Sequence, residues 1–180
     1  LLLVHKLTRA QRVREAIRDG AAPGANAAVA ALTACAEAPA PSAAALAVMC
    51  LANLAGGDER SPIAVLLARK AAVRYAVAAL SAALEGRRHG DINWGAPAVC
   101  MSLRHLALVD ANVASLAELG GLEQLARVVT GETRSRRCTS AEAQQEATHA
   151  LWQCMFFAPA RGRAARSPGL VRALRRLAAS

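Results

Sequence analysis

Apolar residues recur along most of the chain at the three- and four-residue spacing of one helix face, and Gly, Pro and polar stretches interrupt them. The pattern predicts helices over residues 9–19, 25–37, 42–56, 60–70, 72–85, 95–108, 110–119, 121–130, 140–157, 162–167 and 169–178. Residues 1–8 are expected to be the end of a preceding long helix. The candidate N-caps are Ser42, Ser61, Asp110 and Ser140. The pattern therefore predicts an all-α fold.

Three of the predicted helices share one pattern at a nearly constant spacing. VMCLANLA at 48–55, VCMSLRHLA at 99–107 and THALWQCMF at 148–156 align on a leucine, with offsets of 52 and 48 residues. The aligned leucines are Leu51, Leu103 and Leu151. Two shorter predicted helices follow each of the last two stretches, and Gly121 and Gly169 lie at the break between them. These two glycines are again 48 residues apart. A fixed period of this length indicates stacked helical repeats.

The stretch LRHLALVDANVASLAELGGLEQLARVV resembles the armadillo repeat, with Asn112 in its first turn and Gly120–Gly121 at its helix break. EATHALWQCMFF resembles the third-helix motif of the same family, whereas Ala71–Ala72 stands where the preceding unit should have glycine. The resemblance is strongest over residues 93–179 and implies a right-handed α-solenoid of about three to four three-helix units. They would be a partial unit at 1–40 and units at about 41–92, 93–138 and 139–180, forming a single domain of a longer chain.

In the armadillo family the third helices line a concave groove, where a Trp and an Asn one turn apart hold an extended peptide. The resemblance places Met49, Met101 and His149 at the Trp positions, and Asn53, His105 and Gln153 at the Asn positions. Gln145, Glu142 and Trp94 lie one to two turns earlier. Two interpretations are open for this set, a partner-binding groove or ordinary helix surface, with plain core packing for Met49 and Met101.

Trp152 is a separate case, because its neighbours Leu151, Met155 and Phe156 are apolar. We expect it to pack under the last unit. A partly exposed Trp152 beside the groove would instead be an anchor for a partner.

Composition narrows the class further. The chain has 180 residues, of which 54% are hydrophobic and only 3% aromatic, and Ala and Leu dominate. This excludes a disordered tail and argues against a β-sandwich or barrel. No apolar run approaches the roughly 18 residues that a membrane-spanning helix needs, so no membrane insertion is expected. Leu1–Val4 is too short for a signal-peptide core, and the chain lacks an initiator Met.

The formal charge of +9 is unevenly distributed. Residues 134–180 contain nine Arg against Glu142 and Glu146, so this quarter holds most of the excess. Two polar loops, Glu85–Pro97 and Thr130–Thr139, would place a set of arginines on one edge of the repeats: Arg87, Arg88, Arg134, Arg136 and Arg137. The edge is either a binding ridge or a tolerated surface insertion. The C-terminal quarter is either a solvated basic face or a docking patch for acidic protein, nucleic acid or anionic lipid.

Catalytic chemistry is not indicated. The five cysteines form no CxxC pair, the four histidines show no ligand spacing, and no nucleotide-binding or nucleophile motif is present, so neither a metal nor a cofactor is expected. Free thiols favour a reducing intracellular compartment, cytoplasmic or cytoskeletal, with the nucleus as an alternative.

The sequence therefore predicts a non-catalytic protein–protein interaction scaffold, or a structural component of a large multi-subunit or cytoskeletal assembly. The partner would be a protein bound through the groove, the basic edge or both. The alternative is a helical-repeat RNA-binding protein that uses the Arg-rich C-terminal quarter. The low aromatic content weighs against base stacking in that alternative.

Overall fold

A computed structural model describes residues 2–20, 23–38, 40–56, 62–68, 70–134 and 138–179. These ranges contain helices and no strand, apart from an isolated bridge between His89 and Ile92. The predicted all-α class is confirmed. None of the helices in these ranges is long and apolar enough to cross a bilayer.

The helices in the first half of the chain are α1 (Leu2–Thr8), α2 (Gln11–Arg18), α3 (Ala25–Ala36), α4 (Pro41–Ala55), α5 (Pro62–Leu67) and α6 (Lys70–Leu84). Those in the second half are α7 (Ala96–Leu106), α8 (Asp110–Glu118), α9 (Gly121–Thr130), α10 (Ala141–Cys154), α11 (Ala158–Arg166) and α12 (Pro168–Ala178). Most of the predicted boundaries lie within three residues of these.

The prediction was wrong at the start of α11 and at two of the caps. α11 begins at Ala158 rather than at residue 162, because Pro159 fits the first helical turn, where its missing N–H breaks no hydrogen bond. Ser140 is an N-cap as predicted, and its Oγ accepts a hydrogen bond of 3.2 Å from the Ala143 N–H. Ser42 and Asp110 lie inside the first turns of α4 and α8 instead. Ser61 is outside the described residues.

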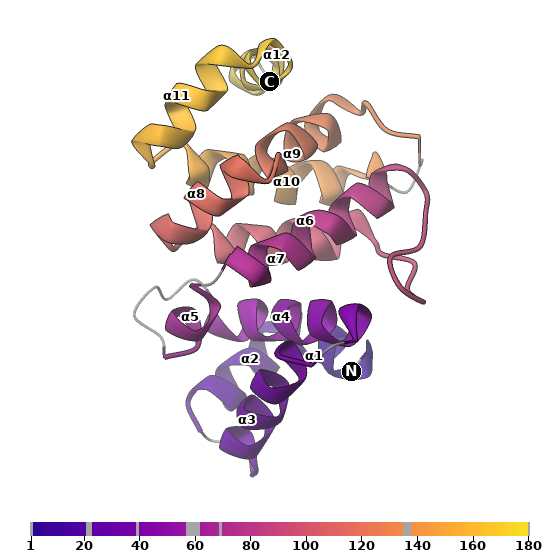
Figure 1. The fold of residues 1–180 in the computed structure, drawn as a ribbon, viewed down its shortest axis with the longest axis vertical. Coiled ribbons are helices and arrows are strands. Elements are labelled where there is room, and N and C mark those ends of the chain that lie inside the picture. The colour runs from indigo at the N-terminus through magenta and orange to yellow at the C-terminus, as the bar shows by residue number, and fades with distance from the viewer. Residues whose placement is uncertain are drawn as a thin grey trace.

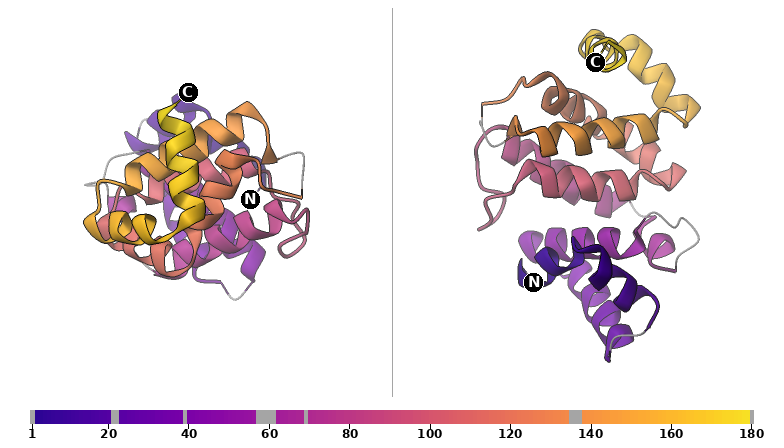
Figure 2. Two further views of the ribbon diagram at one scale, coloured as in Figure 1. Left: turned by 90° about the horizontal axis from the view of Figure 1, so that it is seen from above. Right: turned by 180° about the vertical axis from the view of Figure 1, so that it is seen from behind.

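Helices α4, α7 and α10 lie side by side, with α7 packed between the other two (Figures 1 and 2). Each is followed by a shorter helix and then a longer one, namely α5 and α6, α8 and α9, and α11 and α12. α6 packs on α4, α7, α8 and α9, and α9 packs on α10 and α12. The three leucines that align in sequence, Leu51, Leu103 and Leu151, are all at most 1% exposed. Helices α4, α7 and α10, each with the two helices that follow it, thus form three layers that share one hydrophobic core.

The Gly120–Gly121 break has two separate physical causes. Gly120 has φ of +75°, a left-handed conformation that a residue with a Cβ adopts at a cost. Gly121 needs no unusual φ, but a Cβ there would lie 2.8 Å from Leu116 Cγ and 3.0 Å from Val77 Cγ2. Gly121 thus allows α9 to approach both α8 and α6 closely.

The two polar loops lie on the same edge of the molecule, at the right of Figure 1. The second loop is bonded to the end of α6, where the first loop begins. The Thr133 hydroxyl donates to the Leu84 carbonyl at 2.8 Å, and the Cys138 thiol donates to the Ala83 carbonyl at 3.2 Å. The first loop is held against α4, since a Cβ on Gly90 would lie 2.7 Å from Ser42 Cβ.

Candidate functional site

All the predicted groove residues except Trp94 lie along one side of α4, α7 and α10, which we call the α4–α7–α10 face, and their exposure rises toward α10. On α4, Met49 and Asn53 are fully buried, at 0% exposure. On α7, Met101 and His105 are also buried. On α10, by contrast, Glu142, Gln145 and His149 are exposed and Gln153 is half-buried. Met49 and Met101 therefore follow the core-packing interpretation.

The α4 end of this face is buried because α1 and α2 pack over it (Figure 2). The Asn53 amide Nδ2 donates to Thr8 Oγ1 at 3.5 Å, and Asn53 Oδ1 lies 3.3 Å from Ser102 Oγ. At the far side, the Arg9 guanidinium forms an ion pair of 2.7 Å with Glu142. Asn53 and Glu142 are thus engaged within the chain, rather than by an external peptide.

Trp94 lies in the first polar loop and is 8% exposed. Its indole Nε1 donates to the His89 carbonyl at 3.2 Å, and its ring meets the edge of His5 at a centroid distance of 6.4 Å. Burial, and next the charge of Arg9, lower the pKa of His5 to about 4, so His5 is neutral at pH 7. Trp94 therefore joins the loop to α1 and does not line an open groove.

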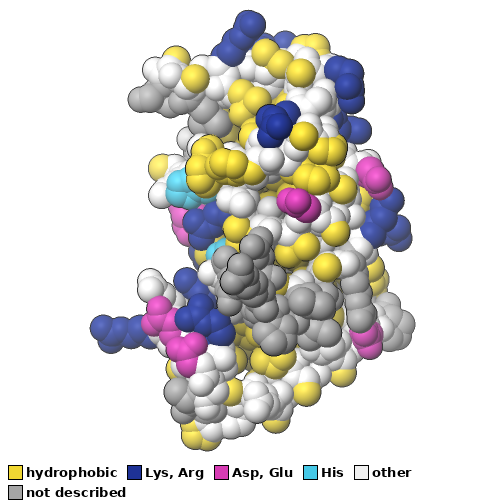
Figure 3. Space-filling model, turned by 90° about the vertical axis from the view of Figure 1, so that its left-hand side faces the viewer, with side chains coloured by type: hydrophobic (Ala, Val, Ile, Leu, Met, Phe, Trp, Pro, Cys, Tyr) yellow, Lys and Arg dark blue, Asp and Glu magenta, His cyan; other side chains and the backbone are white. Residues whose placement is uncertain are grey.

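The structure brings three of the predicted residues together at the carboxyl ends of α4, α7 and α10. His105, His149 and Gln153 line a pocket of about 390 Å³. Its other lining residues are Gly56, Arg104, Leu108 and Trp152. Figure 3 shows histidine, arginine and hydrophobic side chains gathered at the left margin of the face that it presents. This pocket is the open part of the α4–α7–α10 face.

Arg104 is the central polar group of the pocket. Its Nε lies 3.3 Å from Glu146 Oε2, its Nη1 lies 3.4 Å from His149 Nδ1, and its Nη2 lies 3.4 Å from His105 Nε2. Because a guanidinium only donates, both ring nitrogens are acceptors in this arrangement. Burial, followed by the charges of Arg104 and Arg14, lowers the pKa of His105 to about 4. The pocket thus combines a fixed cation with a neutral, buried imidazole.

An aromatic pair stands beside this pocket. Trp152 and Phe156 are 61% and 63% exposed, and their rings meet edge to face with centroids 4.7 Å apart. The expectation that Trp152 packs beneath the last unit was wrong. A signal was present one period earlier, because Trp152 shares its column in the alignment with the charged Arg104, although Ala52 in the same column is buried.

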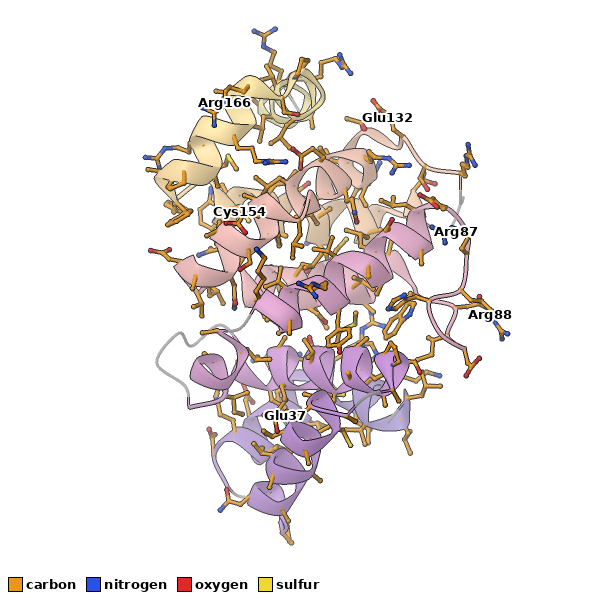
Figure 4. All side chains as sticks on the ribbon, in the orientation of Figure 1. Glu37, Arg87, Arg88, Glu132, Cys154 and Arg166 are labelled. Carbon is orange, nitrogen blue, oxygen red and sulfur yellow. The ribbon has the colours of Figure 1, made fainter. Side chains whose placement is uncertain are left out.

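Three of the five arginines of the predicted basic edge lie within the described residues. Arg87, Arg88 and Arg134 are exposed on the two neighbouring loops, and Figure 4 shows Arg87 and Arg88 at the same margin. Arg87 forms an ion pair with Glu85, which lowers the pKa of that carboxyl through a hydrogen bond and through charge. The other two predicted arginines, Arg136 and Arg137, lie outside the described residues.

Within the described ranges, no group of three or more His, Cys, Asp or Glu side chains could hold a metal ion. All five cysteines are free, and four of them are buried. Burial raises the pKa of Cys50 to about 11 and that of Cys154 to about 12, so neither is a thiolate at neutral pH.

No known protein family matches the chain, and neither a curated protein nor a solved structure is significantly similar to it.

Proposed function

We propose that the chain is a non-catalytic interaction module that binds a protein segment on the α4–α7–α10 face. In this proposal the helices form an armadillo-like right-handed α-solenoid of three to four units, with α4, α7 and α10 as the third helices of successive units. The side-by-side packing of these three helices and the shared burial of their aligned leucines support the arrangement.

The observation that carries the proposal is the exposed pair Trp152–Phe156 beside the pocket. Two adjacent large aromatic side chains, each more than 60% exposed, are the type of surface that recognises a protein partner. Covering on the order of 150 Å² of each ring would contribute about 7 kcal/mol of gross burial free energy, before the costs of association. The Gln153 amide and the His149 ring beside them can bond a partner backbone.

Selection of peptides from a random library on the immobilised chain tests this function. We expect the selected peptides to lose at least about tenfold in affinity for a Trp152→Ala/Phe156→Ala variant, because the aromatic anchors are removed. A matched control, Leu3→Ala/Leu7→Ala, removes two exposed apolar side chains from α1 and should leave the affinities unchanged. Peptides that bind the aromatic variant as tightly as the parent chain would contradict the proposal.

A second candidate function, RNA binding by the C-terminal quarter, is favoured by one observation. Residues 147–180 contain no Asp or Glu, and Arg166, Arg172 and Arg175 are exposed on α11 and α12. Figure 3 shows Lys and Arg side chains at the top of the molecule, where these helices lie, and others at its lower left and right margin. If this function holds, affinity for single-stranded RNA should fall steeply with salt and with replacement of these arginines by Glu. Absence of binding at low salt would exclude it.

A further inference from the structure

The pocket at the ends of α4, α7 and α10 has an apolar wall. Leu108 and Trp152 line it, and Phe156 extends the apolar surface outward from Trp152. A volume of about 390 Å³ is large enough for one large apolar side chain with its backbone. The apolar wall on its own does not say which partner it receives.

The charged groups around the pocket supply that information. Arg104 lines it, and the Arg18 guanidinium approaches from α2, with Nη1 at 3.6 Å from the place of a Cβ on Gly56. Arg161 reaches the same end of α10, where its Nη1 donates to the carbonyls of Met155 and Phe156 at 2.9 and 3.0 Å. Three guanidinium groups thus border the pocket and the aromatic pair.

Carboxylates offset only part of this charge. Glu146 is paired with Arg104 at 3.3 Å, and Asp19 with Arg18 at 3.1 Å. Arg14 on α2 is a fourth cation close to Arg104, and Glu15 is a third carboxylate beside it; burial and then the charge of Arg104 lower the pKa of Arg14. Within the described part of the chain, the surroundings of the pocket therefore have more cations than anions, which favours an anionic ligand.

We propose that this pocket binds an acidic peptide segment that carries one large apolar side chain. The inference rests on the proposed function and names the partner chemistry of the same face. The apolar side chain lies between Leu108 and Trp152, and the flanking carboxylates lie near Arg104, Arg18 and Arg161. The Gln153 amide bonds the peptide backbone. Apolar contact gives the affinity, and the arginines select acidic over basic segments.

Trp152 provides the readout. The full chain labelled with 5-fluorotryptophan has two ¹⁹F signals, one from buried Trp94 and one from exposed Trp152, and a Trp152→Phe variant assigns them. The probes are three nine-residue peptides: Asp/Glu-rich with a central Leu, the same peptide with Ala in place of Leu, and a version with Lys in place of the acids. Each is titrated at low and at moderate salt.

We expect the acidic Leu peptide to shift the Trp152 signal saturably, with affinity several-fold weaker at moderate salt. The Ala peptide should bind about tenfold more weakly, because the apolar contact is lost. The Lys peptide should leave the Trp152 signal unchanged. Equal binding of the Lys and acidic peptides, or no shift with the acidic Leu peptide, would overturn the proposal.

Matched arginine variants locate the charge effect. Arg18→Gln should weaken binding of the acidic Leu peptide by about two- to fivefold, since one rim charge is lost. Arg166→Gln removes an exposed arginine on α11 and should have no effect. If both variants lost the same affinity for the acidic Leu peptide, the preference for acidic peptides would arise from the overall positive charge of the chain, and the assignment to this pocket would be overturned.

The failure of this inference differs from failure of the proposed function. If library peptides require Trp152 but show no acidic preference, the interaction face stands and the partner chemistry proposed here is overturned. If no selected peptide requires Trp152, both are overturned.

Discussion

Gly121→Ala is the substitution whose effect can be worked out most fully from the structure. Its Cβ would lie 2.8 Å from Leu116 Cγ, which is the branch point of the side chain and cannot move away alone, and 3.0 Å from Val77 Cγ2. α9 would therefore have to separate from both α8 and α6. Overpacking of this kind costs about 1–3 kcal/mol.

The matched control is Gly169→Ala, 48 residues later at the same point of the α11–α12 break. Among the described residues, a Cβ there would meet only Arg172 Nη2, at 4.0 Å. The reason is visible in the sequence, because Ala164 stands where Leu116 stands one period earlier. Since Ala favours helix over Gly, we expect this variant to be neutral or stabilised by up to about 1 kcal/mol.

Urea and thermal unfolding followed by far-ultraviolet circular dichroism measure both effects. For a chain of this length, a loss of about 1–3 kcal/mol lowers Tm by about 2–12 °C. Gly121→Ala should show this loss and Gly169→Ala should not. Equal stability of the two variants would refute the close approach of α9 to α6 and α8, and with it the packing between layers.

Three further predictions concern pH, a loop and a thiol. Lowering the pH from 7 to 5 should destabilise the fold by about 2 kcal/mol for each of His5 and His105. The pKa of each is about 4 in the folded chain and 6.5 when the imidazole is exposed, so in this pH range mainly the unfolded chain takes up protons. A urea unfolding midpoint that is the same at both pH values would contradict this prediction. Gly90→Ala should lower the free energy of unfolding, measured in urea, by about 2 kcal/mol or more, because residue 90 has φ of +60° and its new Cβ would lie 2.7 Å from Ser42 Cβ. A variant as stable as the parent chain would show that the first loop is not held against α4. Cys35, the one cysteine that is not buried, should react with a thiol reagent before the other four, as mass spectrometry can measure.

Local pattern was enough to predict most of the helices. Most of their breaks contain Gly or Pro, and the aligned leucines mark the buried side of three of the helices. Caps were less predictable, because Ser42 and Asp110 are equally compatible with a cap and with a first helical turn. The start of α11 was missed, since Pro159 was not taken as a first-turn residue.

The state of the α4–α7–α10 face was only partly predictable. Asn53 has the right position in the aligned sequences, yet it is covered by α1 through contacts between segments that are far apart in the chain, such as Arg9 with Glu142. Helical periodicity within one segment contains no information about such contacts. Trp152 could have been found, because its column in the alignment contains the polar Arg104. Its apolar neighbours Leu151 and Phe156 misled the prediction.

Photocrosslinking from the aromatic pair shows whether a protein partner binds the α4–α7–α10 face. A photoreactive phenylalanine derivative at Phe156 is compared with the same group at Leu7, which is exposed on α1. If the α4–α7–α10 face is the binding surface, Phe156 should crosslink to a protein partner in the native extract, Leu7 should not, and excess acidic Leu peptide should suppress the adduct. Adducts from Leu7 alone, or equal adducts from both positions, would contradict the account.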